Sequence, residues 1–351
     1  MRRRDFITLI SGATAWISVG RAQEPRRVIG ILSGFSNPLP FPGGMAAFHQ
    51  GLNETGFVEG KNISIASRWA DGHYDRLPSF AVELVGQNVS VIWVTDVPSA
   101  FAAKAATKSI PIVFAIGADP VKIGLVKSLS RPNSNLTGMS IFHSILGQKR
   151  VELLHELLPT VNTIALLANP DHPSFQPDVL DIQAATAALK ERLEVLAVSG
   201  ESDLEAAFAT MAQRRVGALI SEPDPLLMSR CERVVELAAR HALPAMYPSR
   251  VFSDRGGLIS YGSSVLDPIH RAGIYVGKIL KGANPADLPI QQSTKVELAW
   301  NSTRSESPDS EAAKGFIGLN NLTPIVSPYG VSKPKSACVS SSVLSIHNLT
   351  D

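Results

Sequence analysis

The sequence predicts an α/β protein with two doubly wound parallel-sheet lobes joined by three crossovers. Three observations lead to this prediction. The chain has 351 residues, more than one hydrophobic core usually organises. From residue 27 onward, short runs rich in Val and Ile alternate with helical patterns of about 10 to 15 residues, which is typical of βαβ units and a parallel sheet. A polar, turn-rich stretch at 131–140 then separates two series with the same order of elements.

The first half of the chain supplies strand patterns that are each followed by a helical pattern. The strands are short apolar runs, and the helices place apolar residues three and four positions apart. In chain order, the predicted strands are 27–34, 62–70, 89–96 and 110–117, and the helices that follow them are 43–56, 75–88, 97–109 and 119–130.

The second half repeats this arrangement and begins with a helix. Its last part adds a strand and a long helix within 256–282, and a strand at 295–301. Before these come predicted strands at 163–170, 191–200, 216–224 and 243–250, and predicted helices at 147–159, 175–190, 202–215 and 226–242.

Three polar crossings, near residues 138, 262 and 296, predict that each lobe is built from separate segments. We expect an N-terminal lobe of residues 27–138 and 263–296, and a C-terminal lobe of residues 139–262 and 297–300. The tail at 301–351 is rich in Ser, contains several prolines and lacks sustained periodicity. We therefore expect this atypical tail to be poorly ordered.

The first 22 residues have the layout of a signal peptide. A basic start precedes an apolar stretch from Phe6 to Val19, and the small residues Gly20 and Ala22 follow it. The pair Arg3-Arg4 also fits a twin-arginine signal for Tat export, although an ordinary Sec signal that carries arginines is an alternative. Either route predicts a periplasmic protein.

Composition and motifs argue against several classes of function. The net charge is +2, and no basic stripe interleaved with aromatic residues suggests nucleic acid. The two cysteines, Cys231 and Cys338, and the scattered histidines show no metal-ligand spacing. No dinucleotide fingerprint, P-loop or nucleophile elbow is present. We expect no catalytic residues, no cofactor and no metal, although acid–base work by Asp119 and Asp224 remains open.

Polar and aromatic side chains gather where the predicted strands end. In an open parallel sheet, ligands bind in the crevice beyond the carboxyl ends of the strands, so two facing lobes would line one cleft from both sides. A mixture of hydroxyls, amides, carboxylates and aromatic rings suits a small polar ligand. The sequence therefore predicts a ligand-binding cleft with these candidate residues: Ser33, Phe35, Thr95, Asp96, Asp119, Asn169, Asp224 and Tyr261.

Several candidates also have a purely structural interpretation. Asp119 and Asp224 each precede a proline, so each could simply cap a helix that has proline in its first turn. Capping does not prevent contact with a ligand. Asn169 could begin an ordinary turn, Ser33 could belong to a tight turn, and Tyr261 could pack at a hinge. The residues alone leave these alternatives open.

Six stretches of the chain carry a resemblance to a known family. They include AAFHQGLNETGFVEGKNISI and PIVFAIGADPVKIGLVKSLSRPNSNLTG, and they extend from the signal to about Leu298. They resemble the ABC-transporter substrate-binding protein family, which includes tryptophan- and other amino-acid-binding lipoproteins and has the type I periplasmic-binding fold. The six stretches are residues 2–9, 46–65, 68–85, 111–138, 217–247 and 256–298.

The resemblance implies a ligand buried between two lobes that close about a hinge. It implies a periplasmic, monomeric solute-binding component that delivers a small polar solute, such as an amino acid, to a membrane permease with a cytoplasmic ATPase. For an amino acid, it implies carboxylate binding by hydroxyls and N–H groups near Ser33 and Thr95, pairing of the ammonium with Asp119 or Asp224, and covering of the side chain by Phe35 or Tyr261.

Two other functions are compatible with the same fold. One is a periplasmic ligand-sensing module that regulates a partner kinase or receptor. The other is an enzyme on a two-lobed scaffold, which would need a nucleophile or metal that the sequence does not show. The chain also departs from the family after Leu298, where AWNSTRSESPDSEAAKG replaces the family's strand and helix. A frameshift near codon 299 or a diverged tail would explain this departure.

Overall fold

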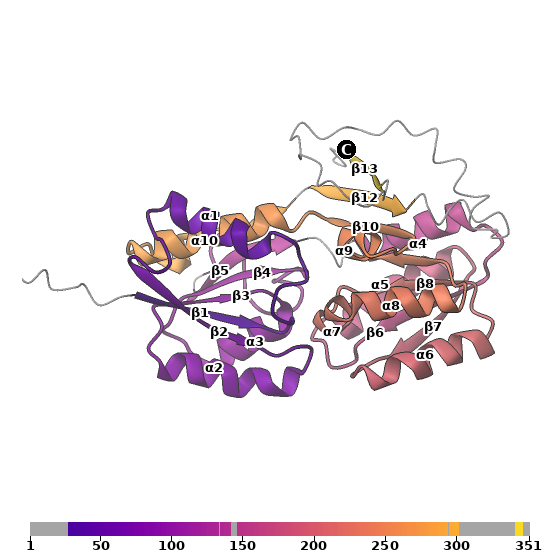
Figure 1. Cartoon of the computed structure of the whole chain (residues 1–351), viewed down its shortest axis with the longest axis horizontal. Coiled ribbons are helices and arrows are strands. Elements are labelled where there is room, and N and C mark those ends of the chain that lie inside the picture. The colour runs from indigo at the N-terminus through magenta and orange to yellow at the C-terminus, as the bar shows by residue number, and fades with distance from the viewer. Residues whose placement is uncertain (1–26, 133, 142–145, 294, 302–340, 347–351) are drawn as a thin grey trace, which may run out of the picture.

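The computed structural model describes residues 27–132, 134–141, 146–293, 295–301 and 341–346. These residues form two lobes, each built around one sheet with helices on both faces (Figure 1). The predicted α/β architecture of two doubly wound lobes is confirmed. The predicted signal peptide, residues 1–22, lies outside the described residues, as do residues 302–340 and 347–351 of the predicted tail.

The sheet of the N-terminal lobe is parallel throughout. Its strand order is β11-β5-β4-β3-β1-β2. The central strands β3 and β4 are buried along their whole length, which explains why they read as continuous apolar runs. The strands are β1 (Arg27–Ser33), β2 (Ile63–Trp69), β3 (Val91–Val94), β4 (Ile112–Ile116), β5 (Leu136–Ile141) and β11 (Gln291–Ser293).

Two pairs of helices cover the faces of this sheet. Along β1, Ile29 and Ile31 pack in the core under α1 and α10, whereas Leu32 packs in the core under α2 and α3, as the alternation of side chains along a strand requires. The helices are α1 (Gly44–Glu54), α2 (Leu77–Gly86), α3 (Val97–Ala106) and α10 (Leu266–Leu280), with short 3₁₀ turns η1 (Tyr74–Arg76) and η2 (Pro285–Asp287).

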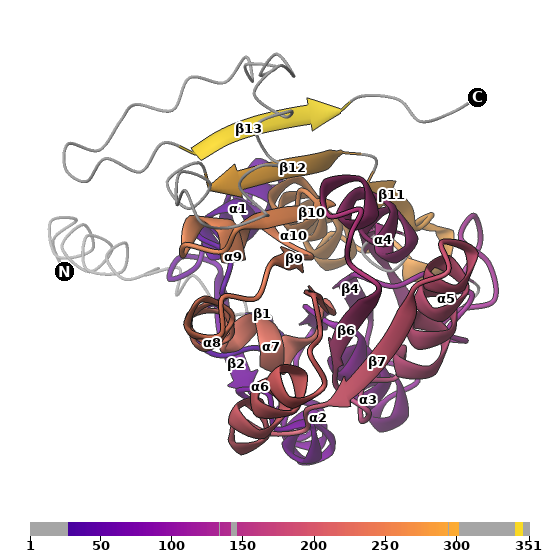
Figure 2. The same ribbon diagram turned by 90° about the vertical axis from the view of Figure 1, so that its right-hand side faces the viewer.

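The sheet of the C-terminal lobe has the order β13-β12-β10-β9-β8-β6-β7. In this sheet, β12 runs antiparallel to both of its neighbours, β10 and β13 (Figure 2). Helices α4 and α5 pack on one face, and α6 and α8 pack on the other. The strands are β6 (Thr163–Ala168), β7 (Arg192–Ala197), β8 (Ala218–Ser221), β9 (Ala245–Tyr247), β10 (Ile259–Ser263), β12 (Val296–Asn301) and β13 (Ser341–Ile346). The helices are α4 (Leu146–Leu157), α5 (Phe175–Ala188), α6 (Ser202–Gln213), α7 (Pro225–Ser229), α8 (Cys231–Arg240) and α9 (Arg250–Asp254).

The chain passes between the two sheets after β5, after β10 and between β11 and β12. The boundary predicted at residue 138 lies too early, because it falls inside β5. The polar residues that suggested a turn are buried strand residues with satisfied hydroxyls. Thr137 Oγ1 donates to the Leu288 carbonyl at 2.7 Å, and Ser140 Oγ donates to the Ala118 carbonyl at 3.1 Å.

The helix predicted at 119–130 is wrong. The segment makes one turn, in which the N–H of Ile123 donates to the Asp119 carbonyl, and Gly124 then adopts a φ of 72°. A residue in this left-handed region ends a helical turn. Lys104 Nζ donates to the carbonyls of Gly124 and Leu125 at 3.0 and 2.9 Å, which holds the turn against α3.

Two further expectations need correction in the C-terminal lobe. The helix predicted at 226–242 is divided into α7 and α8 at Arg230, whose φ and ψ of −104° and 23° are not helical. Within the tail, which we expected to be poorly ordered, residues 341–346 pair with β12 as β13. An exposed edge strand offers unpaired N–H and C=O groups, and the run SSVLSI has the composition to pair with it.

Candidate functional site

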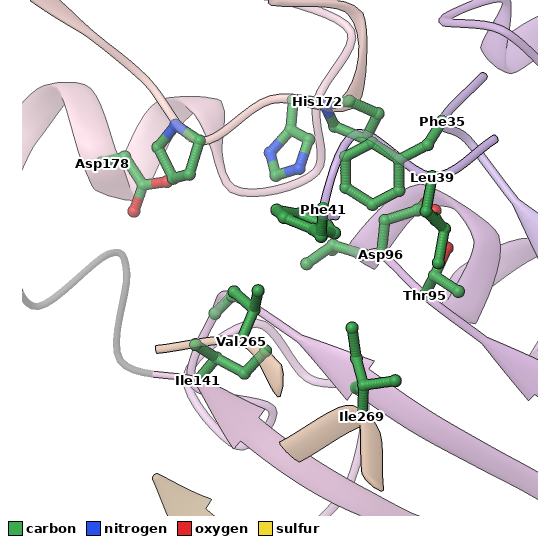
Figure 3. A pocket seen from close by; sticks show the side chains of 16 residues that line it. Phe35, Leu39, Phe41, Thr95, Asp96, Ile141, His172, Asp178, Val265 and Ile269 are labelled. Atoms are coloured by element: carbon green, nitrogen blue, oxygen red, sulfur yellow. The ribbon is translucent and has the colours of Figure 1, made fainter. Parts of the chain in front are cut away.

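A pocket lies between the lobes at the carboxyl ends of the parallel strands. It contains about 630 Å³ of empty space, part of it open to solvent. Figure 3 shows side chains from both lobes and from the connecting segments around it. Its lining residues are Phe35, Leu39, Phe41, Thr95, Asp96, Val97, Ala115, Gly117, Ala118, Ile141, His172, Asp178, Pro223, Pro225, Val265 and Ile269.

Five of these residues, Phe35, Leu39, Phe41, Val265 and Ile269, contribute large apolar side chains to the pocket, and we call them the apolar wall. The rings of Phe35 and Phe41 meet edge to face, with centroids 5.3 Å apart and an interplanar angle of 80°. Aromatic pairs of this kind are rigid and offer large apolar surfaces. The apolar wall suits the ring or aliphatic chain of a ligand.

Two of the candidate residues, Thr95 and Asp96, follow β3 and line the pocket. Thr95 Oγ1 lies 2.7 Å from Ser33 Oγ and 3.0 Å from Asp96 Oδ2. Asp96 also caps α3 by accepting from the Ser99 N–H at 2.9 Å, and it accepts from the Gly34 N–H at 2.6 Å. Burial raises the pKa of Asp96, although these donors oppose the rise. Ser33 is fully buried beneath the pocket, where it orders the loop that carries Phe35.

Asp224 caps α7 and also joins the two lobes. Its Oδ1 accepts from the N–H groups of Leu226 and Leu227 at 2.8 and 3.1 Å, and its Oδ2 accepts from the Tyr74 hydroxyl at 2.5 Å. Burial raises the pKa of Asp224 to about 6, although hydrogen bonds from Tyr74 and Asn169 oppose the rise. Asp224 and Asn169 do not line the pocket itself. They line a smaller cavity beside it.

Two predicted residues are not brought to the pocket. Asp119 Oδ1 accepts from the N–H groups of Val121 and Lys122 at 2.8 and 3.2 Å, so its carboxylate orders its own turn. Tyr261 packs in the core of the C-terminal lobe between β10 and α4. A binding role for Asp119 or Tyr261 stays a prediction that this arrangement of the lobes does not favour.

A smaller recess adjoins the pocket and contains acidic residues that we did not predict from the sequence. We call it the acidic recess. It shares His172, Asp178 and Pro223 with the pocket, and its other residues are Ala168, Asn169, Phe175, Glu222 and Asp224. The spacing of residues in α5 could have revealed Asp178. This residue lies four positions before Ile182 and eight before Thr186, on the buried stripe of the helix.

Burial controls the charges of the acidic recess. It raises the pKa of Glu222 to about 8, with a further rise from Asp178 and an opposing effect from the guanidinium of Arg150. It lowers the pKa of His172 to about 4, so this ring is neutral near pH 7. Arg150 is fully buried and lines neither cavity. Its positive charge still lowers the pKa of Glu222 through the protein interior.

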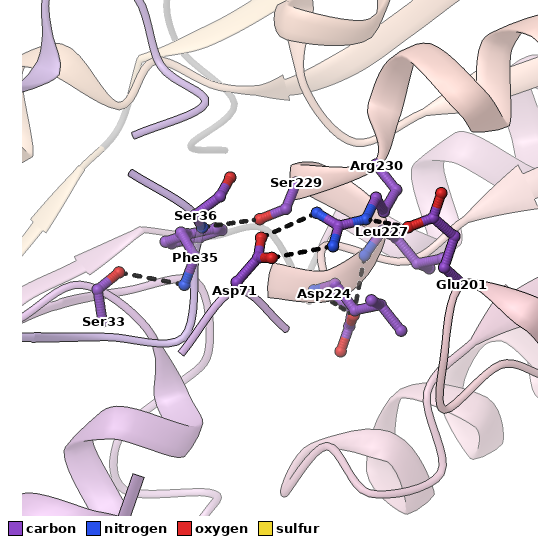
Figure 4. A network of polar contacts seen from close by, with 10 residues as sticks. Ser33, Phe35, Ser36, Asp71, Glu201, Asp224, Leu227, Ser229 and Arg230 are labelled. Atoms are coloured by element: carbon purple, nitrogen blue, oxygen red, sulfur yellow. Dashed lines mark hydrogen bonds and ion pairs between the residues drawn. The ribbon is translucent and has the colours of Figure 1, made fainter. Parts of the chain in front are cut away.

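Polar contacts join the lobes around the pocket. Arg230, at the break between α7 and α8, donates from two nitrogens to the Asp71 carboxylate at 2.9 and 3.0 Å (Figure 4). The N–H of Ser36 donates to Ser229 Oγ at 3.1 Å. Lys122 pairs with Asp181 at 2.6 Å. The two lobes are therefore in direct polar contact at these three places.

We expect a Tyr74→Phe variant to lower the free energy of unfolding by about 1–3 kcal/mol, because it removes a donor from the buried Asp224 carboxylate. Urea denaturation measures this change. Tyr261→Phe is the matched control: its hydroxyl makes no hydrogen bond within the described part of the chain, so we expect a change within about 0.5 kcal/mol. Equal effects of the two substitutions would contradict a stabilising role of the Tyr74–Asp224 contact.

The described residues lack two further features, a metal-binding group and a membrane-spanning helix. These residues contain no group of three His, Cys, Asp or Glu side chains arranged to hold a metal ion. Within the same ranges, no helix combines the length and the apolar character needed to cross a bilayer.

Comparisons with known proteins agree with this architecture. The chain is 28% identical over 256 residues to the tyrosine-binding protein of Clostridioides difficile (strain R20291), which covers 72% of this chain and 73% of that protein. A conserved domain protein of Vibrio cholerae has a TM-score of 0.74 and 26% identity, covering 82% of this chain and 98% of that structure. An ABC domain from Streptococcus pneumonia in complex with L-Trp has a TM-score of 0.69 and 25% identity, covering 78% and 91%.

The family assignment rests on a separate match, to a family model. The profile of the family described as ABC transporter substrate binding protein matches residues 43–308, which include most of both lobes and every residue that lines the pocket except Phe35, Leu39 and Phe41. The resemblance found in the sequence is confirmed, and the chain belongs to the ABC transporter substrate-binding protein family.

Proposed function

We propose that this protein is the solute-binding component of an ABC importer and that it binds an amino acid with an aromatic or large apolar side chain. The observation that carries the proposal is the pocket, which joins the apolar wall of one lobe to the acidic recess of the other. A zwitterion with an apolar side chain has groups that match both. The tyrosine-binding and L-Trp-bound relatives support this class of ligand.

The proposal includes a location and partners. Export by the twin-arginine signal at residues 1–22 would bring the protein to the periplasm. We expect the exported protein to be a monomer. There it would deliver its ligand to a membrane permease driven by a cytoplasmic ATPase. Cell fractionation tests the location, and co-purification from detergent-solubilised membranes tests the permease contact.

Ligand binding can be tested by thermal unfolding of the mature chain from Gln23, screened against amino acids, small peptides, purines and organic acids. A ligand at 100 times its dissociation constant stabilises the folded state by about 2.7 kcal/mol, which gives a visible shift of the unfolding temperature. We expect L-tryptophan or L-tyrosine to raise it. A shift caused solely by purines or organic acids would contradict the proposed ligand class.

Transport and sensing require a separate experiment. Uptake of the radiolabelled amino acid is measured in cells with and without the gene for this chain. We expect uptake to fall in its absence and to return when the gene is restored. Unchanged uptake together with a lost transcriptional response to the amino acid would favour the ligand-sensing alternative.

A Phe41→Ala variant should bind its amino acid at least about tenfold more weakly, because it removes half of the aromatic pair in the apolar wall. Titration calorimetry with L-tryptophan or L-tyrosine measures this loss. Phe101→Ala is the control, since Phe101 lies on α3 outside the pocket lining and should keep wild-type affinity. Equal affinities of the wild type, Phe41→Ala and Phe101→Ala would show that the ligand does not bind against Phe41.

A further inference from the structure

The short helix α7 contacts the N-terminal lobe at both of its ends. At its first end, Asp224 Oδ2 accepts a hydrogen bond from the Tyr74 hydroxyl at 2.5 Å. At its last end, the Arg230 guanidinium donates to both carboxylate oxygens of Asp71 at 2.9 and 3.0 Å (Figure 4). A bidentate pair of this kind combines charge with a fixed geometry. The helix therefore bridges the two lobes.

Between these two polar contacts, the loop at residues 71–74 packs closely against α7. A Cβ added at Gly72 would lie 2.7 Å from Leu226 Cδ1 and 3.1 Å from Leu226 Cα. Leu226 itself is 3% exposed. Such short distances leave no room for a side chain at residue 72, so the backbone of one lobe packs directly on the helix of the other.

On each lobe, this contact is attached to a residue that lines the pocket. The Asp71 N–H donates to the Phe35 carbonyl at 3.1 Å, and Phe35 belongs to the apolar wall. On the other lobe, Pro225 lines the pocket and is the first residue of α7. Separation of the lobes at α7 would therefore also separate Phe35 from Pro225 and open the pocket.

We propose that α7, Arg230 and residues 71–74 form a latch, which holds the lobes together over the bound amino acid and sets how long the ligand stays bound. Asp71 and Arg230 line neither the pocket nor the acidic recess, so they are positioning residues that do not touch the ligand. Without their pair the lobes would part more often, and the ligand would leave faster although it enters at the same rate. This inference rests on the proposed function and adds the residues that control release.

The test measures both rate constants for L-tryptophan and L-tyrosine with the mature chain, by stopped-flow fluorescence at several ligand concentrations. We expect Asp71→Asn and Arg230→Gln each to raise the dissociation rate constant about fivefold and to leave the association rate constant within about twofold. The double variant should dissociate no faster than the single variants, because either substitution already removes the pair. Asparagine tolerates the φ of 53° at residue 71, so Asp71→Asn keeps the shape of the loop.

Two control variants separate the latch from other ion pairs. Lys122→Gln removes the pair with Asp181, which also joins the lobes but does not involve α7. Glu201→Gln removes the partner that Arg230 has within its own lobe. Both pairs are partly exposed, so both variants should keep the dissociation rate constant within about twofold of the wild type.

Each outcome decides the proposal. Wild-type dissociation in both single variants, or a double variant whose effect is the product of the two single effects, would contradict the latch and leave the proposed function intact. A fivefold effect of Lys122→Gln would also contradict it, because the influence would then not be specific to α7. If neither amino acid binds, the proposed function is contradicted, and urea denaturation of the same variants tests the latch. A shared, non-additive loss of stability would support it, and an additive or absent loss would overturn it.

Discussion

A Glu222→Gln variant is expected to be more stable than the wild-type protein at pH 8, by an amount of the order of 4 kcal/mol. Burial raises the pKa of Glu222 from 4.5 to about 8 in the folded chain. Between these two values, the folded wild-type chain holds a proton that the unfolded chain has already released. Its free energy of unfolding therefore falls as the pH rises from about 4.5 to 8, and glutamine, which does not titrate, removes this contribution.

The groups around Glu222 set the size of the effect. The carboxylates of Asp178, Asp224 and Asp181 add to the rise of its pKa, and the guanidinium of Arg150 opposes it. Urea denaturation at several pH values between 4.5 and 8.5 measures the difference between variant and wild type. Glu232→Gln, at an exposed carboxylate, should follow the wild-type profile. Parallel profiles for Glu222→Gln and the wild type would show that Glu222 is ionised at neutral pH in the folded protein.

A Gly138→Ala variant is expected to lose at least about 3 kcal/mol of stability. Gly138 has a φ of 153° in β5, and an added Cβ would lie 2.1 Å from the Phe114 carbonyl oxygen and 2.6 Å from its nitrogen. Phe114 belongs to β4, which is held between β3 and β5 and cannot move aside without breaking the sheet.

The matched control for this substitution is Gly86→Ala. Gly86 ends α2 with an ordinary φ, and no neighbouring atom lies within 4 Å of an added Cβ. We expect this variant to match the wild type or to gain up to about 1 kcal/mol, because alanine restricts the unfolded chain more than glycine does. Urea denaturation measures both variants. A Gly138→Ala protein within 1 kcal/mol of the Gly86→Ala protein would contradict the packing of β5 against β4.

The fold was largely predictable because its signals are local. Buried parallel strands such as β3 and β4 are continuous apolar runs, and the helices between them have regular apolar spacing. The errors arose where single residues adopt a structure that differs from the one that the local sequence pattern predicts. Gly124 ends a turn that reads as a helix, and Thr137 and Ser140 are buried in a strand although their side chains suggest a loop.

The pocket was predictable in part, for a similar reason. Phe35, Thr95 and Asp96 follow strand ends, and the topology of a parallel sheet brings such residues to one edge. Asp178 and Ile269 reach the pocket from helices, so their contribution depends on how α5 and α10 pack. Tyr261 lies outside the pocket lining because it shares a face of β10 with Ile259, and that face packs on the core. Such orientations depend on tertiary contacts that a single sequence does not reveal.

The central claim is that an amino acid binds in the pocket between the lobes, with its side chain on the apolar wall. The most direct measurement is a crystal structure of the mature chain grown with the amino acid that most raises its unfolding temperature. The account predicts density in the pocket, with the side chain of the amino acid against Phe35 and Phe41. An amino acid bound outside the pocket, or one bound in it with its side chain away from Phe35 and Phe41, would contradict the account.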